Sequence, residues 1–372
     1  MHYSTVYVGM DVHKETFSLS CYTNEKETAE YPKKVEAHYS KVINYLEAMR
    51  FHYGDDVLFV CGYEAGCLGY TLYHELTAHN VKCIILAPST MPVLAGKKIK
   101  TDRRDAAHIA QCLAHHEYKP VHIPTKKDEQ VKEFIRMRND HTLALKKVKQ
   151  QINAFCLRHG YHYDGTKSHW TQAHINWLRS LKLDDLYQEI LEEYLLTYDY
   201  LTEKIGRIDQ RIEELASEEE YKENVHKLEC FLGIKTQTAL SVITETGDFV
   251  RFPDADHYAA YLGLVPGEHS SGGDKNRLGI TKAGNRHVRT LLVEAAQSYG
   301  RGQIGHKSKI LAARQEGNPS AVIEYADRAN ERLRRKYYRL TLKNGKPANV
   351  AKTAVARELA CFIWGMMTEH YA

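Results

Sequence analysis

The run Thr5–Val12 (TVYVGMDV) decides the fold of the first part of the chain. Its β-branched and apolar residues are typical of a buried strand, and Thr16–Tyr22 (TFSLSCY) alternates apolar and polar residues after a short polar turn. Two strands joined in this way pair antiparallel. Val57–Cys61 and Val81–Leu86 are further buried runs, and each follows a predicted helix. Strands that are reached through helices pair parallel, so the pattern predicts an α/β domain with a mixed sheet.

The rest of the chain is predicted to be mainly helical. Asp102–His115 begins with the turn Asp-Arg-Arg-Asp, and a long basic helix is expected over Glu129–Arg158. A later stretch has apolar residues at alternating spacings of three and four, as in the seam of a coiled coil. These residues are Leu191, Tyr194, Tyr198, Leu201, Ile205, Ile208, Ile212 and Leu215. Such a seam pairs within the chain or with another subunit, and the pattern leaves both open.

The length of 372 residues predicts more than one domain. We divide the chain into three parts: residues 1–160 with the α/β domain and the long basic helix, residues 161–226 as a coiled-coil or helical linker, and residues 227–372. The last part is expected to be helical, because glycine and proline separate helical patterns from Leu228 onward.

Charge is segregated along the chain, although the formal net charge is only +4. Residues 97–158 carry 15 Lys+Arg and 7 Asp+Glu, and residues 301–372 carry 14 and 6, so each segment has a net charge of +8. Between them, residues 181–224 carry 5 Lys+Arg and 14 Asp+Glu, a net charge of −9. Two basic segments with an acidic spacer favour a polyanion as partner, while any single charged run is also typical of a solvated helix face.

Composition predicts a soluble cytoplasmic protein. No apolar stretch approaches the roughly 18 residues of a membrane helix. The eight cysteines form no C-x-x-C pair and most stand in apolar contexts, which is typical of reduced core thiols. A loose group of histidines lacks the cysteine pair or H-E-x-x-H motif of a zinc site, so we predict no zinc there. It comprises His159, His162, His169 and His174.

Four acidic residues stand where strands end and a helix begins. Asp11 ends the first strand, Glu64 follows the third, and Asp102 and Asp105 share one helix face because they lie three residues apart. If they converge at one edge of the sheet, four carboxylates need cations to stay ionised, and their oxygens suit one or two Mg²⁺ ions. For Asp102 alone, a helix cap is an equally simple interpretation.

The loop Val265–Gly279 (VPGEHSSGGDKNRLG) is polar and rich in glycine. Ser270 and Ser271 precede two glycines that let another backbone approach closely. Serine and glycine in a loop are usually only a turn, so this spacing alone does not identify a nucleophile.

Three segments, MDVHK (Met10–Lys14), YEAG (Tyr63–Gly66) and KTDRRDA (Lys100–Ala106), resemble in order and spacing the DEDD motif of a family of bacterial insertion-sequence transposases. That family has a RuvC-like domain of RNase H fold. The second half resembles the same family's transposase domain. Its matching segments are Leu228–Asp248, Tyr261–Pro266, Ser270–Gly273, Gly279–Arg289 and Gly345–Leu359. One departure is Lys235, which stands where a helix-hairpin-helix turn usually has a second glycine.

The resemblance implies an RNase H-like domain in which Asp11, Glu64, Asp102 and Asp105 bind Mg²⁺ for catalysis. It implies Ser271 as the nucleophile, and the neighbouring Ser270 leaves that assignment open by one residue. A 5′-phosphoserine link would conserve the energy of the phosphodiester, in keeping with a chain that has no P-loop motif for a nucleotide.

The resemblance also implies partners. Members of the family are guided by an element-encoded structured RNA that pairs with donor and target DNA. Their active site combines carboxylates of one subunit with a serine of another, so we expect a homo-oligomer, a dimer or tetramer, formed through the coiled coil. The expected nucleic-acid-binding residues are Lys97, Lys98, Lys100, Arg103, Arg104, Lys146, Lys147, Lys275, Arg277, Lys282, Arg286, Arg334 and Arg335.

Two other functions remain open to the sequence. A metal-dependent, junction-resolving or nicking DNA nuclease of RNase H fold would use the four acids, and its serine loop would be structural. A nucleic-acid-binding protein without catalysis is expected to lack one of the acids, and all four are present.

Overall fold

The computed structural model describes residues 4–66, 68–92, 101–165, 168–268 and 277–371. Contacts within the chain divide it into two compact units, Met1–Ile123 and Pro124–Ala372. Each unit has apolar cores of its own.

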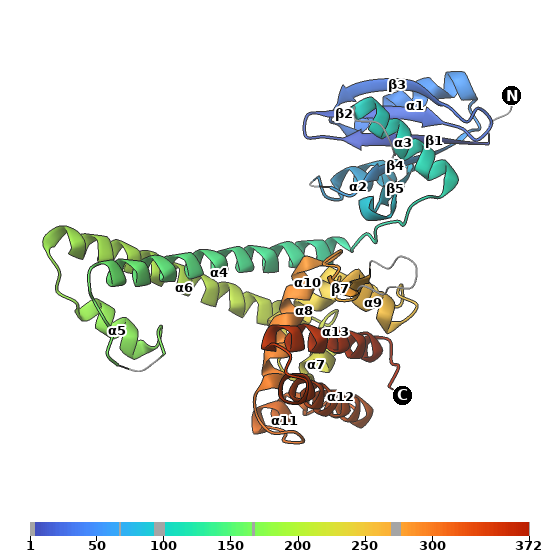
Figure 1. Ribbon diagram of the computed structural model, residues 1–372. Coiled ribbons are helices and arrows are strands. Elements are labelled where there is room, and N and C mark those ends of the chain that lie inside the picture. Colours follow the sequence, from blue (N-terminus) through green and yellow to red (C-terminus); the bar gives the residue numbers. More distant parts are fainter. Residues whose placement is uncertain (1–3, 67, 93–100, 166–167, 269–276, 372) are drawn as a thin grey trace. The chain divides into compact units, whose positions relative to one another are not determined.

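A five-stranded mixed sheet forms the centre of the first unit (Figure 1). Its strand order is β3-β2-β1-β4-β5; β1, β2 and β3 pair antiparallel, and β1, β4 and β5 pair parallel. The strands are β1 (Thr5–Val12), β2 (Thr16–Tyr22), β3 (Ala29–Glu36), β4 (Leu58–Glu64) and β5 (Lys82–Leu86). The mixed sheet predicted from the sequence is thus confirmed. The edge strand β3 was not predicted, because it contains Pro32 and is largely exposed, so it carries no buried apolar pattern.

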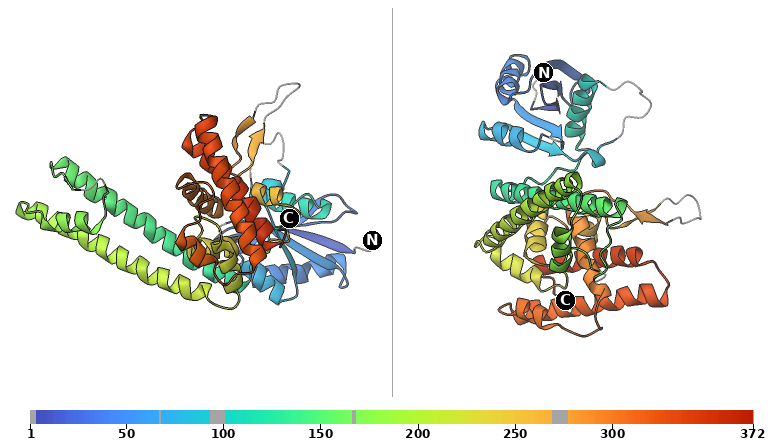
Figure 2. Two further views of the ribbon diagram at one scale, coloured as in Figure 1. Left: turned by 90° about the horizontal axis from the view of Figure 1, so that it is seen from below. Right: turned by 90° about the vertical axis from the view of Figure 1, so that its left-hand side faces the viewer.

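Side chains of β1 alternate between the two faces of the sheet. The even-numbered ones are buried in a core with α1 (Tyr39–Tyr53) and α2 (Thr71–Ala78). On the other face, Gly9 lies against the backbone of α3 (Asp102–His115). The right-hand view of Figure 2 shows α1 and α2 on one side of the sheet and α3, in teal, on the other. Asp11 is two residues after Gly9 and therefore belongs to the α3 face.

The second unit is mainly helical, as predicted, and includes a short two-stranded ribbon, β6 (Pro266–Glu268) and β7 (Arg277–Ile280). Its helices are α4 (Lys126–Arg158), α5 (Gln172–Ser180), α6 (Asp185–Ala216), α7 (Lys222–Glu229), α8 (Thr236–Thr246), α9 (Ala255–Tyr261), α10 (Arg286–Ala295), α11 (Lys309–Gln315), α12 (Ser320–Tyr338) and α13 (Ala348–Met367). Short 3₁₀ or π segments lie at Pro88–Thr90, Ala296–Gly300 and Arg339–Lys343.

Helices α4 and α6 form a long antiparallel hairpin (Figure 1). The predicted heptad seam of α6 is largely buried, and its members share apolar clusters with residues of α4 such as Ile135 and Phe155. Arg138 of α4 donates to both carboxylate oxygens of Asp209 of α6, at 2.7 and 3.1 Å. The seam therefore pairs within the chain, which resolves the two alternatives that the pattern left open.

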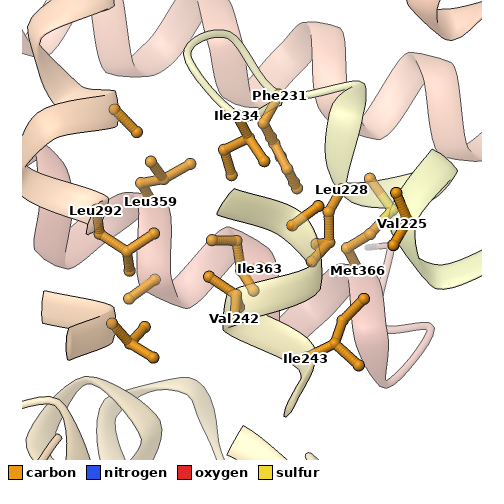
Figure 3. Packing of buried hydrophobic residues seen from close by; sticks show 14 of the residues in the cluster. Val225, Leu228, Phe231, Ile234, Val242, Ile243, Leu292, Leu359, Ile363 and Met366 are labelled. Carbon is orange, nitrogen blue, oxygen red and sulfur yellow. The ribbon is translucent and has the colours of Figure 1, made fainter. Parts of the chain in front are cut away.

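The core of the second unit joins helices from across its sequence. Figure 3 shows Leu228 of α7, Val242 of α8, Leu292 of α10 and Ile363 of α13 together, and all four are fully buried. Burying a side chain of this size contributes about 1.5–3 kcal/mol. No helix in the described ranges has the length and apolar character needed to cross a membrane.

The turn between α7 and α8 explains why Lys235 is tolerated. Gly233 has φ +87°, and a Cβ there would lie 2.4 Å from the carbonyl oxygen of Ala295, so this position requires glycine. Lys235, by contrast, has φ −119°, which any residue adopts. The missing second glycine thus causes no backbone strain.

Candidate active site

Gly9 lets helix α3 pack directly on strand β1. A Cβ at this position would lie 2.0 Å from the carbonyl oxygen of Ala106 and 2.3 Å from the amide nitrogen of Ala110. Residues 102, 106 and 110 follow one another at a spacing of four on the helix, while residues 9 and 11 share one face of the strand. The close contact therefore brings Asp102, one turn before Ala106, next to Asp11.

Asp11, His13 and Asp102 meet at this point. One ligand atom of each lies within 4.8 Å of the others. His13 Nε2 is 3.1 Å from Asp11 Oδ2 and 4.0 Å from Asp102 Oδ1. The side chain of Asp11 is 18% exposed and that of Asp102 is 44% exposed, so the group opens to solvent. His13 was not predicted as a ligand, although it stands in the MDVHK segment.

The two aspartates differ in their electrostatic surroundings. Partial burial raises the pKa of Asp11; His13, when protonated, counteracts this, and the negative charges of Asp105 and Asp102 add to it. The pKa of Asp102 is lowered, because Lys34 donates a hydrogen bond to it and carries a positive charge. A cation bound here would offset the burial and the acidic charges that disfavour ionised Asp11.

Glu64 and Asp105 lie at the same end of the sheet. Met10 pairs with Tyr63 in the parallel register, so Asp11 and Glu64 are the next residues on neighbouring strands. Asp105 lies in the first turn of α3, and its charge acts on Asp11. Asp11 and Asp102 form, with His13, the one group of possible metal ligands found among the described residues, and Glu64 and Asp105 are not members of it.

Two protein-family models match the chain. The model described as the transposase IS116/IS110/IS902 family matches residues 225–307, and a DEDD transposase model of the IS110 type matches residues 8–160. The y4qE protein of Sinorhizobium fredii is 34% identical over 369 residues, which are 99% of this chain and 90% of that protein. This chain belongs to the IS110 family of transposases.

Other relatives agree with this assignment. The transposase for insertion sequence element IS1533 of Leptospira borgpetersenii is 30% identical over 349 residues, 92% of this chain and 98% of that protein. The pilin gene-inverting protein of Moraxella bovis is 24% identical over 309 residues, 80% of this chain and 84% of that protein. The chain is therefore an insertion-sequence transposase, an enzyme whose substrates are DNA.

The acids of this transposase fit a divalent metal. Its sheet order and the DEDD match are consistent with the expected RNase H-like fold, and that match indicates the use of a divalent metal. Carboxylate oxygens are the ligands that Mg²⁺ and Mn²⁺ prefer, and a bound ion would offset the burial and the neighbouring acidic charges that raise the pKa of Asp11. His13 places an imidazole nitrogen beside the two carboxylates.

A cavity of about 460 Å³ opens beside the acids. It is lined by Ser18, Leu19, Pro32, Lys33, Lys34, Thr101, Asp102 and Arg103. Lys34 Nζ lies 3.0 Å from Asp102 Oδ2. Neither lysine was predicted to take part in function, because β3 was not recognised as a strand; the available signal was the lysine pair after Pro32, since lysine and proline are typical of sheet edges.

The basic residues that were predicted to bind nucleic acid differ in their exposure. Lys97, Lys98, Lys100 and Lys275 lie outside the described residues, as does the side chain of Arg277. Seven others are exposed: Arg103, Arg104, Lys146, Lys147, Lys282, Arg286 and Arg335. Arg334 differs from the prediction: it is only 9% exposed and donates to the carbonyl oxygens of Gln303 and His306, so its guanidinium supports the fold.

The predicted nucleophiles Ser270 and Ser271 lie outside the described residues, between strands β6 and β7. The base of this ribbon is tightly built. A Cβ at Gly263 would lie 2.1 Å from the carbonyl oxygen of Ala283, and a Cβ at Gly284 would lie 1.9 Å from that of Tyr261. Both glycines have positive φ, so the ribbon leaves the core at a point that tolerates no larger residue.

Proposed function

We propose that this transposase cuts and rejoins DNA at a Mg²⁺ centre held by Asp11, Glu64, Asp102 and Asp105, with a serine as the nucleophile. The observation that carries the proposal is the close approach of Asp11 and Asp102, in which neighbouring acids contribute to the raised pKa of Asp11. Acids arranged against their own repulsion are typical of a site that binds cations.

Each residue of the centre has a role that follows from its position. When bound, the metal polarises the phosphodiester and stabilises the charge that develops on its oxygens. Asp11 at a strand end and Asp102 at a helix start offer carboxylate oxygens from two rigid elements that are packed together through Gly9. His13 is within hydrogen-bonding distance of Asp11 and orients its carboxylate.

Ser271 is the proposed nucleophile, on the strength of the family resemblance. Its Oγ forms a bond to phosphorus while the bond from phosphorus to the 3′ oxygen breaks. The serine proton is removed, and the leaving 3′ oxygen gains a proton, so the products are a 5′-phosphoserine and a free 3′-hydroxyl. Attack by the 3′-hydroxyl of another strand reverses these changes, and no nucleoside triphosphate is consumed.

We also propose that an element-encoded guide RNA pairs with the donor and target DNA. Exposed basic residues in both units support a long polyanion partner, among them Arg103 and Arg286. In this proposal residues 1–160 hold the metal centre, residues 161–226 form a spacer, and residues 227–372 present the serine. A homo-oligomer, dimer or tetramer, supplies carboxylates from one subunit and a serine from another.

Trapping on nicked or mismatched DNA that carries the element's end tests the proposal. The wild-type protein with Mg²⁺ and guide RNA should form a covalent protein–DNA adduct. Ser271→Ala should lose the adduct, while the matched control Ser270→Ala should retain it. Metal-dependent cleavage without any adduct would instead identify a junction-resolving or nicking nuclease with a structural serine loop.

A further inference from the structure

Lys34 is aligned with the acidic centre by the register of the sheet. Asp11 of β1 pairs with Ser18 of β2, and Ser18 pairs with Lys34 of β3. Paired residues of neighbouring strands point to the same face, so these three side chains form one row on the face that α3 covers. Lys33 is one residue away on β3 and belongs to the opposite face.

The row ends in an ion pair with a predicted metal ligand. Lys34 Nζ is 3.0 Å from Asp102 Oδ2, on the carboxylate whose other oxygen lies 4.0 Å from His13. The two side chains are 58% and 44% exposed. Ion pairs as exposed as this one contribute little to stability, so the contact is readily exchanged for another.

The cavity beside this pair suits an anion. Its lining includes the cationic residues Lys34 and Arg103 and the hydroxyl-bearing Ser18 and Thr101, with Asp102 as its acidic member. Lys33 also borders the cavity, but its side chain belongs to the opposite face of the sheet. Once the charge of Asp102 is neutralised by a cation, the lining becomes strongly basic. A phosphate of a nucleic-acid strand is the anion that a transposase would bring to this place.

We propose that Lys34 is a positioning residue that exchanges partners during the reaction. Without metal, its ammonium forms an ion pair with the carboxylate of Asp102. If Asp102 held a divalent cation, the ammonium of Lys34 would be displaced from this carboxylate, and its long side chain would turn to a backbone phosphate of the strand in the cavity. Metal binding and strand binding are thereby coupled through one side chain. This inference rests on the metal centre of the proposed function.

Two properties distinguish this role from a purely structural one. In the metal-free protein, Lys34 competes with the cation for Asp102, so removing its charge should tighten metal binding. In the metal-loaded protein, Lys34 contacts phosphate, so removing its charge should weaken strand binding. A lysine that only anchored β3 to α3 would change both affinities in the same direction.

The first experiment is a titration of the full-length protein with Mn²⁺, in which electron paramagnetic resonance measures the free and bound ion. Lys34→Met retains the aliphatic stem, and Lys33→Met is the matched control. We expect Lys34→Met to bind Mn²⁺ about 3–10-fold more tightly than wild type, the effect of removing one opposing, partly screened charge. Lys33→Met should be unchanged. Equal affinities for both variants, or weaker binding by Lys34→Met, would overturn the inference.

Asp11→Asn separates this inference from the proposed function. If Asp11→Asn lowers Mn²⁺ affinity and Lys34→Met does not raise it, the metal centre stands and the role of Lys34 is wrong. If Asp11→Asn leaves Mn²⁺ affinity unchanged, the metal centre itself is wrong, and with it the inference.

The second experiment measures binding of a single-stranded oligonucleotide at several salt concentrations, in the Ser271→Ala background to prevent covalent products. With Mn²⁺, Lys34→Met should lower the slope of the logarithm of the binding constant against the logarithm of the salt concentration. The decrease should correspond to about one phosphate contact. With EDTA, Lys34→Met should not change oligonucleotide binding, because in the metal-free protein the Lys34 ammonium is paired with Asp102 and does not contact the phosphate. Any effect of Lys33→Met on oligonucleotide binding should be the same with Mn²⁺ and with EDTA. A Lys34 effect that is the same with and without metal would contradict the exchange.

Discussion

Two acidic sites of the molecule differ in how their charges are compensated. In the second unit, Glu245 is 4% exposed and accepts two hydrogen bonds from Arg136, at 2.8 and 3.1 Å, and one from Asn285 at 3.0 Å. In the first unit, Asp11 has a pKa raised by burial and by neighbouring acids, and Lys34 and His13 reach Asp102 from the solvent side.

The difference separates a structural acid from a functional one. The side chain of Glu245 is only 4% exposed, and its charge is matched by a guanidinium in bidentate geometry, which holds α4, α8 and α10 together. Asp11 and Asp102 lie side by side, ionised Asp11 is disfavoured by burial and by the neighbouring acids, and the partial exposure of both leaves room for an ion. A buried acid whose charge is fully paired, such as Glu245, therefore indicates a structural role. Acids that lie close together and are partly exposed, such as Asp11 and Asp102, indicate a functional role.

Replacing Asp11 should have the strongest effect on activity. Asp11→Asn removes a metal ligand, so we expect metal-dependent strand cleavage to fall by at least about 10²–10³-fold, the scale of losing one group that stabilises transition-state charge. Cleavage of a labelled element end measures this. RNA binding should be retained, because it depends mainly on lysine and arginine. Parallel loss of RNA binding would indicate misfolding and count against a catalytic role.

Replacing Glu245 should have the strongest effect on stability. Glu245→Ala leaves Arg136 and the buried Lys132 without this carboxylate, so the free energy of unfolding should fall by about 1.5–3 kcal/mol. Urea unfolding followed by tryptophan fluorescence reports this unit alone, since Trp170, Trp177 and Trp364 all belong to it.

A surface pair provides the control for that measurement. Arg211 and Glu214 are 51% and 52% exposed and 2.6 Å apart, so Glu214→Ala should cost less than about 1 kcal/mol. Equal losses for the two variants would contradict the structural role of Glu245.

Enlarging Gly9 links stability to the site. Gly9→Ala places a Cβ 2.0 Å from the carbonyl oxygen of Ala106, so α3 must move away from β1. We expect a loss of about 1–3 kcal/mol and weaker Mn²⁺ binding, because Asp102 moves with the helix. Gly66→Ala is the control, since its nearest atom is 3.9 Å away. Unchanged metal affinity in Gly9→Ala would show that the Gly9 contact does not position the acids.

The pH dependence of stability should show a smaller effect. The pKa of Asp11 is raised in the folded protein, so ionised Asp11 destabilises the metal-free fold above that pKa, and protonation relieves the penalty as the pH falls through it. Asp11→Asn should therefore raise the Tm in EDTA at pH 7, and its advantage should shrink toward acidic pH. Calorimetry at several pH values measures this; an Asp11→Asn protein less stable than wild type at pH 7 would disagree with the prediction.

The sequence predicted the parts of the fold that depend on local pattern. The β-branched run Thr5–Val12, the alternation in Thr16–Tyr22 and the later strands reached through helices were sufficient to predict the mixed sheet. The strand end and the helix start at Asp102 that carry two of the acids were predicted in the same way. Strand β3 was missed because Pro32 and exposed lysines replace the apolar pattern of a buried strand. Lys34 was missed with it.

Other features depend on contacts between distant segments. A heptad pattern states which face of α6 is apolar and does not state its partner, so the pairing with α4 required the structure. Glu245 lies 109 residues from Arg136 along the chain, and the sequence around either residue does not predict their ion pair. Arg334 was assigned to nucleic acid because a basic helix face does not reveal which of its arginines turn inward.

Thermal unfolding with increasing Mn²⁺ examines the metal centre itself. A ligand that binds only the folded state raises the Tm with its concentration. We predict that Mn²⁺ raises the Tm of the first unit in the wild-type protein and in Glu245→Gln, and has no such effect on Asp11→Asn. An equal rise in wild type and Asp11→Asn, or no rise in either, would contradict a metal site at Asp11 and Asp102.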